Sequence, residues 1–155
     1  MALDDHSGME ILDAPTCWAL LRQAEVGRLA VAIQNKPDIF PINHIVDHGS
    51  IVFRTAEGPK LASAVLGLAV AYEVDGYEPD TGEAWSVVVK GRAGEIEQMH
   101  EVLEALDLPL FPWHAAHKPR FVRIQAREVT GRRFHVVSGT ASNGSTTGAR
   151  RAAPE

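Results

Sequence analysis

Helical spacing of apolar residues is confined to short stretches of this chain. The first stretch follows Asp13, a suitable N-cap residue, and has Pro15 in its first turn. Its apolar residues recur at helical spacing until Gly27 ends the pattern; they are Cys17, Leu20, Leu21 and Ala24. Similar spacing predicts a short helix over residues 60–66 and a third helical face within residues 96–106.

Alternation with a period of two covers most of the remaining chain and predicts β-strands. The predicted strands are residues 27–33, 39–46, 50–55, 68–74, 84–94 and 121–126, and residues 132–137 continue the last one or pair with it. Turn residues between the second and third strands make these two a hairpin, whereas the polar residues 75–82 predict a loop. Three prolines exclude regular structure over residues 108–119.

Six strands with only short helices between them predict a mainly β fold, an antiparallel six-stranded barrel, rather than a doubly wound sheet. The 155 residues suffice for one domain, which we place at residues 1–137. Residues 138–155 are mostly Ser, Thr, Gly, Ala and Arg. They have too few apolar side chains to offset the entropy of ordering, so we expect a flexible tail.

Charge and cysteine content narrow the classes of partner. The formal net charge is −5, whereas proteins that bind duplex nucleic acid carry a basic face, so we expect no nucleic-acid partner. No apolar stretch approaches about 18 residues and no secretory leader is recognisable, so we expect a cytoplasmic protein without membrane contact. The single cysteine, Cys17, lies on the apolar side of its helix and is expected to be a packed thiol.

Two cations and a hydroxyl flank the turn between the third strand and the second helix. Alternation places Val52 and Arg54 on one face of the strand, and Lys60 falls in the first helical turn, where a cation opposes the helix dipole. A bound phosphate would offset that charge and accept hydrogen bonds from Arg54, Thr55 and Lys60. The alternative is a surface pair of Arg54 with Glu57 and a solvated Lys60, and spacing alone does not choose between the two.

The seven histidines are scattered without the spacing of a zinc site, so we expect no metal. His114 and His117 form a loose pair in a proline-rich segment that has no acidic neighbours. His44 shares the apolar face of its strand, where a packed, hydrogen-bonded histidine is expected rather than a catalytic base.

Pro41 and Asn43 occupy the opposite face of the same strand. Proline cannot donate to a strand ladder, so the strand is an edge or opens at Pro41. A flat ring could enter such an opening and bond the unpaired amides. For Asn43, a structural side chain bonded to backbone is the alternative.

These segments together resemble the pyridoxamine 5′-phosphate oxidase-like, flavin-binding split-barrel superfamily over residues 10–136. The resemblance rests on the order and spacing of Gly27-Arg28-Leu29-Ala30, Pro41-Ile42-Asn43-His44, Phe53-Arg54-Thr55, Gly58, Lys60, residues 85–93, Pro112-Trp113 and residues 129–134. It implies a six-stranded antiparallel split β-barrel with short flanking helices. It also implies a homodimer that holds flavin mononucleotide (FMN) in a cleft between its subunits.

The resemblance further implies a set of cofactor-binding residues but no catalytic residue. The residues implied for the phosphate segment are Arg54, Thr55, Lys60 and Leu61. Those implied for the edge of the isoalloxazine ring are Pro41, Ile42 and Asn43. Trp85, Ser86 and Trp113 are implied contacts from the partner subunit, although by themselves the two tryptophans are as readily packing residues.

The function implied is that of an FMN-dependent oxidoreductase that reduces or oxidises a small organic substrate by hydride transfer. One alternative is a deazaflavin-dependent reductase, whose longer acidic cofactor needs further basic residues; Lys90, Arg92, Lys118 and Arg120 are available for it. A second alternative is a flavin- or haem-binding protein without turnover. The segment from Arg132 to His135 only partly matches the substrate-binding motif of pyridoxamine phosphate oxidases, so we do not expect synthesis of pyridoxal phosphate.

Overall fold

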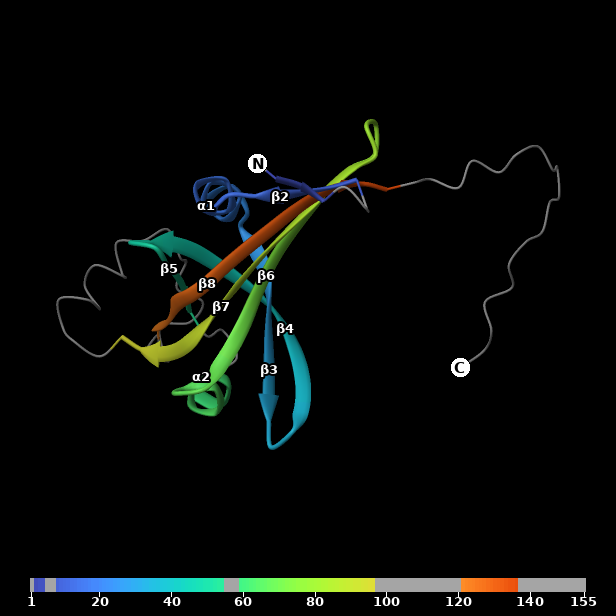
Figure 1. Ribbon diagram of the computed structural model, residues 1–155. Coiled ribbons are helices and arrows are strands. Elements are labelled where there is room, and N and C mark those ends of the chain that lie inside the picture. The colour runs from blue at the N-terminus through green and yellow to red at the C-terminus, as the bar shows by residue number, and fades with distance from the viewer. Residues whose placement is uncertain (1, 5–7, 55–58, 97–120, 137–155) are drawn as a thin grey trace, which may run out of the picture.

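The computed structural model describes residues 2–4, 8–54, 59–96 and 121–136 (Figure 1). In chain order the elements are β1 (Ala2–Asp4), β2 (Met9–Leu12), α1 (Ala14–Gln23), β3 (Val26–Ile33), β4 (Lys36–Asp47), β5 (Ser50–Arg54), α2 (Pro59–Val65), β6 (Ala69–Glu78), β7 (Glu83–Glu95) and β8 (Phe121–His135).

Six of these strands close into an antiparallel ring in the order β8-β5-β4-β3-β6-β7, with β7 pairing back onto β8. The N-terminal strands extend the sheet beyond the ring, because β2 pairs with the C-terminal half of β8 and β1 pairs with β2. The predicted six-stranded antiparallel barrel with short flanking helices is confirmed.

The strand predictions are confirmed apart from their ends and one loop. The predicted loop at residues 75–82 is wrong over its first half, because β6 continues to Glu78 and pairs with β7 as far as Glu83. The two C-terminal segments form one strand, β8, of 15 residues. The helical face within residues 96–106, the irregular segment 108–119 and the tail 138–155 lie outside the described residues, apart from Ile96.

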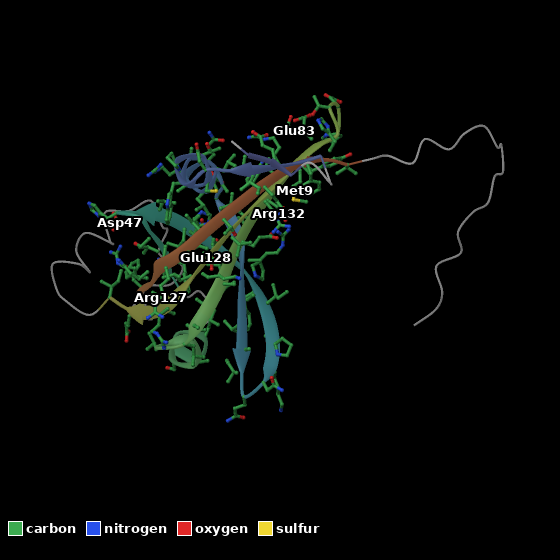
Figure 2. All side chains as sticks on the ribbon, viewed as in Figure 1. Met9, Asp47, Glu83, Arg127, Glu128 and Arg132 are labelled. Carbon is green, nitrogen blue, oxygen red and sulfur yellow. The ribbon has the colours of Figure 1, made fainter. Side chains whose placement is uncertain are left out.

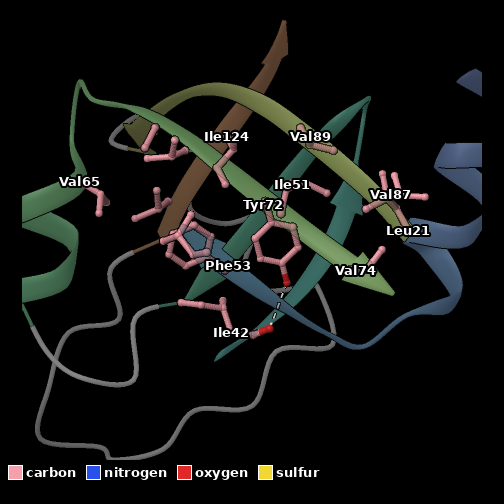
Figure 3. Packing of buried hydrophobic residues seen from close by; sticks show 14 of the residues in the cluster. Leu21, Ile42, Ile51, Phe53, Val65, Tyr72, Val74, Val87, Val89 and Ile124 are labelled. Atoms are coloured by element: carbon pink, nitrogen blue, oxygen red, sulfur yellow. Dashed lines mark hydrogen bonds between the residues drawn. The ribbon is translucent and has the colours of Figure 1, made fainter. Parts of the chain in front are cut away.

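The inner faces of the ring strands form one apolar core (Figure 3). Its largest fully buried side chains include Tyr72, Phe53, Leu21 and Leu29. Helix α1 begins at its predicted cap, since the Asp13 carboxylate accepts a hydrogen bond of 2.9 Å from the Thr16 N–H.

Helix α1 contributes two fully buried residues to the core, Cys17 and Leu21. Position 131 in β8 must be glycine for this packing, because a Cβ there would lie 2.6 Å from the Cys17 sulfur. The predicted packed thiol is confirmed, and burial raises the pKa of Cys17.

Candidate functional site

The two neighbours of β4 cover it unequally. Strand β3 pairs with residues 36–43, whereas β5 pairs only with residues 44–47. On the β5 side, residues 36–43 therefore have an edge that no described strand covers, and the β3–β4 hairpin extends past β5 in Figure 1. Of the two predicted possibilities, that the strand is an edge or opens at Pro41, the structure shows an edge on the β5 side that includes Pro41.

Peptide groups of β4 point into this opening at alternate residues. The His44 N–H donates to the Glu25 carbonyl over 3.1 Å, on the side of β3. Neighbouring residues of an antiparallel strand turn their peptide groups to opposite sides, so those of Pro41 and Asn43 face the open edge. The edge therefore offers the Pro41 carbonyl as an acceptor and the Asn43 N–H as a donor. This pair suits a planar ligand with an imide-like edge.

Side chains along β4 follow the predicted alternation. Pro41 and Asn43 are exposed on the outer face, which we define as the face turned away from the core. Ile42 and His44 are buried on the inner face. Ile42 therefore belongs to the core, where its carbonyl oxygen lies 3.1 Å from the Tyr72 hydroxyl oxygen.

Arg54 is the last residue of β5 and lies close to this opening. The β4–β5 ladder ends with His44 opposite Phe53, so the next position brings Arg54 level with Asn43. Phe53 is fully buried, and alternation turns Arg54 to the outer face together with Asn43. The guanidinium and the open edge of β4 therefore lie on the same side of the barrel.

The rest of the predicted phosphate segment is only partly described. Thr55 and the Lys60 side chain lie outside the described residues. Helix α2 contains the backbone of position 60, as the sequence predicted, and Leu61 in this helix is buried, with 8% of its surface exposed.

Trp85 and Ser86 lie on β7, on opposite faces of the sheet. Trp85 packs against the core, and it requires glycine at position 76, where a Cβ would lie 2.5 Å from the indole Nε1. Ser86 faces outward into a groove of about 640 Å³ that crosses β6, β7 and β8. The groove is also lined by Tyr77, Arg132 and Phe134. The third predicted partner contact, Trp113, lies outside the described residues.

A charged cluster beside the groove was not recognised from the sequence. Arg28 on β3 makes ion pairs with Glu73 (3.1 Å) and Asp75 (2.8 Å) on β6. Arg28 also lies opposite Pro41 in the β3–β4 ladder, so the cluster adjoins the open edge. Burial raises the pKa of Glu73, Asp75 raises it further and Arg28 opposes the shift.

His44 is a packed residue with two hydrogen bonds, as the sequence predicted. Its Nε2 lies 2.9 Å from the Leu21 carbonyl and its Nδ1 lies 2.5 Å from the Tyr72 hydroxyl. Burial lowers the pKa of His44. Only 3% of its surface is exposed, so this imidazole does not reach the outer face.

Within the described ranges, no three His, Cys, Asp or Glu side chains gather as metal ligands would. His114 and His117 lie outside those ranges. None of the described helices is long and apolar enough to cross a membrane.

A family model described as pyridoxamine 5′-phosphate oxidase matches residues 13–133. The chain belongs to this family. Among curated relatives of this pyridoxamine 5′-phosphate oxidase family member, the uncharacterised Rv0080 of Mycobacterium tuberculosis is 34% identical over 134 residues, which cover 83% of this chain and 88% of Rv0080.

Two solved structures are similar to this family member over nearly their whole length. A FAD binding protein from Mycobacterium smegmatis is 37% identical, with a TM-score of 0.71, over 81% of this chain and 98% of that protein. A candidate pyridoxamine 5′-phosphate oxidase from Corynebacterium glutamicum is 41% identical, with a TM-score of 0.72, over 83% and 99% of the two chains.

Proposed function

We propose that this protein binds a flavin nucleotide between two copies of itself and transfers hydride to or from a small organic substrate. The proposal rests on one observation: Arg54 lies level with Asn43, next to the open edge of β4 that includes Pro41. Family membership and the similarity to a FAD binding protein support it.

The residues present fit a flavin. Arg54, with Thr55 and Lys60 where α2 begins, would hold the phosphate through charge-assisted hydrogen bonds. The Pro41 carbonyl and the Asn43 N–H would bond the imide edge of the ring. When bound, the flavin supplies the hydride chemistry, while the protein positions the ring and excludes water from it.

The flavin we propose is FMN, whose single phosphate matches the single cradle predicted at Arg54. The M. smegmatis relative binds FAD, which makes FAD the competing choice. Both carry the same ring and the same first phosphate, so Arg54 would serve either.

The partner subunit is proposed because one chain cannot bring all the predicted contacts together. Ser86 lies opposite Arg132 and Arg54 lies opposite Phe121 on the same strand, β8, so the two are 11 residues apart along that strand, about 36 Å in extended backbone. A second copy could place its own Ser86 groove over the open edge of β4.

The outer face also has the composition of an interface. A second groove of about 510 Å³ crosses β3, β6, β7 and β8; small apolar residues of β3 and β6 line one side, and Lys90, Arg127 and Glu128 line the other. Ile39 on the neighbouring β4 is 62% exposed. Small apolar side chains on the outer face of a sheet allow a second sheet to approach closely.

Flavin binding is tested by titrating the purified, flavin-free protein with FMN and with FAD. We expect a shift of the visible flavin band and quenched flavin fluorescence. Arg54→Ala should weaken binding about tenfold or more, because a charge-assisted contact to phosphate is lost. Arg22→Ala, at an exposed position in the last turn of α1, is the matched control. An unperturbed spectrum with both flavins, or equal binding by the two variants, would refute the proposal.

The dimer is tested by light scattering. We expect twice the chain mass, and Ile39→Lys on the outer face should shift the protein toward monomer. Ala19→Lys on the exposed side of α1 should not. A wild-type monomer at every concentration tested would exclude the shared site, whatever the flavin titration gives.

The rate at which the bound flavin is reoxidised distinguishes an oxidoreductase from a flavin carrier without turnover. Reduced, flavin-loaded protein is mixed without oxygen with quinones and nitroaromatics, and we expect reoxidation faster than that of free flavin. Reoxidation at the rate of free flavin would make the protein a carrier. Parallel titrations with deazaflavin and haem test those two cofactors, and tighter binding of either would replace FMN in the proposal.

A further inference from the structure

A groove of about 420 Å³ lies between the end of β7 and the start of β8, away from the open edge of β4. Three arginines line it: Arg92, Arg123 and Arg127. One carboxylate, that of Glu95, also lines it. The groove is therefore locally basic on a chain whose formal net charge is −5. Arg127 is labelled in Figure 2 at this end of the barrel.

The strand register explains how three arginines reach one groove. Arg92 lies opposite Gln125, so Arg123 and Arg127 are its two diagonal neighbours on β8. Diagonal neighbours on adjacent strands are about 7–8 Å apart, within reach of long side chains. The guanidinium of Arg127 can therefore approach that of Arg92, whereas Arg123 turns toward Ser50 on β5.

Alternation from Arg123 and Gln125 keeps Arg127 on the same outer face, and a β-bulge follows at this residue. Lys90 lies opposite Glu128 and Gly91 lies opposite Ala126, so Arg127 is the extra residue of β8. The bulge ends the regular pairing of β8 with β7 beside Arg127. The bulge requires glycine at position 91, because a Cβ there would lie 2.0 Å from the Gln125 carbonyl oxygen.

Two of the three arginines make their hydrogen bonds to described residues through Nη1 alone. Nη1 of Arg123 donates to Ser50 Oγ (2.6 Å) and to an Asp47 carboxylate oxygen (3.1 Å). Nη1 of Arg92 donates to the Gly67 carbonyl. A guanidinium has five N–H donors, so each keeps further donors for a ligand. Arg127 is exposed and makes no ion pair with a described residue.

The groove floor is open as well as basic. Gly94 lies opposite Arg123, and no heavy atom lies within 4 Å of the position that its Cβ would occupy. A ligand can therefore reach the strand backbone between Arg92 and Arg123. Asp47 already balances the charge of Arg123, so the repulsion that a bound anion would remove is that between Arg92 and Arg127.

We propose that this groove binds a small molecule carrying a diphosphate group, held by Arg92 and Arg127, with Arg123 at the edge of the groove. Guanidinium groups bind phosphate oxygens in pairs of parallel hydrogen bonds. Two linked phosphates can engage Arg92 and Arg127 at once. The inference does not rest on the proposed flavin, since Arg54 does not line this groove.

The test is isothermal titration of inorganic pyrophosphate into the full, flavin-free chain. Arg127→Gln, which removes no contact with a described residue, should weaken binding about fivefold, and Arg92→Gln with Arg127→Gln about tenfold or more. Arg22→Gln on α1 is the matched control and should bind like the wild type. The thermal midpoint of each variant, measured without pyrophosphate, verifies that it is folded.

Three outcomes would overturn the site. One is equal binding by the double variant and the wild type, which would make pyrophosphate an adventitious ion only. Another is equal weakening in Arg22→Gln, which would indicate attraction to surface charge in general. The third is loss of pyrophosphate binding in Arg54→Ala, which would place the anion in the proposed flavin cradle. Loss of flavin binding alone in that variant leaves the site intact.

Discussion

The Tyr72 hydroxyl donates a hydrogen bond to Nδ1 of His44 over 2.5 Å inside the barrel. The direction follows from the other ring nitrogen, since Nε2 lies 2.9 Å from the Leu21 carbonyl, which can only accept. Nε2 therefore carries the proton of the neutral ring and Nδ1 accepts. Through these contacts Leu21 of α1, His44 of β4 and Tyr72 of β6 are joined in the core. The Tyr72 hydroxyl also lies 3.1 Å from the Ile42 carbonyl oxygen.

Tyr72→Phe is expected to destabilise the fold by about 1–3 kcal/mol, because it leaves Nδ1 of His44 buried without a donor. Urea unfolding measures the change. Tyr77→Phe is the control, because Tyr77 is 55% exposed and should change stability by less than about 0.5 kcal/mol. Equal stability of Tyr72→Phe and the wild type would mean that the hydrogen bond contributes nothing to folding.

Stability is expected to fall as the pH drops below the ordinary histidine pKa of 6.5. Burial lowers the pKa of His44 in the folded state, so in this window the unfolded chain binds the proton and the folded chain does not. The contribution of the neutral His44 to the free energy of unfolding is complete above pH 6.5, and it is lost as the pH falls through the lower pKa of the folded state.

Urea midpoints well above and well below pH 6.5 measure this loss. His44→Gln should flatten the dependence, whereas His48→Asn should not, because the His48 side chain is 86% exposed. The assignment to His44 fails if the slope is the same in all three proteins.

Two substitutions should move the pKa of Glu73 in opposite directions. Asp75→Asn removes a neighbouring negative charge and should lower it, whereas Arg28→Gln removes an ion pair and should raise it. Because the folded pKa lies above the ordinary glutamate value of 4.5, the contribution of Glu73 to stability is present below that pH and is lost as the pH rises through the folded value. Carboxyl-carbon NMR titration measures each shift, and movement in one direction only would contradict the cluster geometry.

Gly76→Ala is expected to cost about 1–3 kcal/mol of stability, because the new methyl group would overlap the Trp85 indole. The NMR signal of the indole N–H should shift as the ring moves. Gly94→Ala is the matched control, since it meets no atom within 4 Å and should have little effect. An unchanged indole signal in Gly76→Ala would show that Trp85 is not held as described.

The sequence predicted the barrel because its strands have strong local signals. Alternation on β4 separates Pro41 and Asn43 from Ile42 and His44, and a single proline predicts the opening. These inferences depend on the period of the strand and on the missing proline N–H, which are properties of a few consecutive residues.

The charged cluster could not be predicted in the same way. Arg28 and Glu73 are 45 residues apart, and they meet only because β3 pairs with β6 in one particular register. The end of β6 was missed for a related reason. Residues 75–78 have the polar composition of a loop, but pairing with β7 holds them as a strand. Long-range pairing of this kind leaves no signature in neighbouring residues.

The exposed edge of β4 also bears on aggregation, because a bare strand edge is a template for pairing with another chain. The peptide groups of Pro37 and Pro41 face the uncovered edge of β4, opposite β3, and proline has no N–H to donate there. Between them, the Ile39 N–H is already bonded to the Asp38 carboxylate over 2.9 Å. A foreign strand would therefore find no free N–H donor at residues 37, 39 and 41, the alternate positions whose peptide groups face this edge. The edge can stay open to a ligand while it disfavours pairing with strands of other chains.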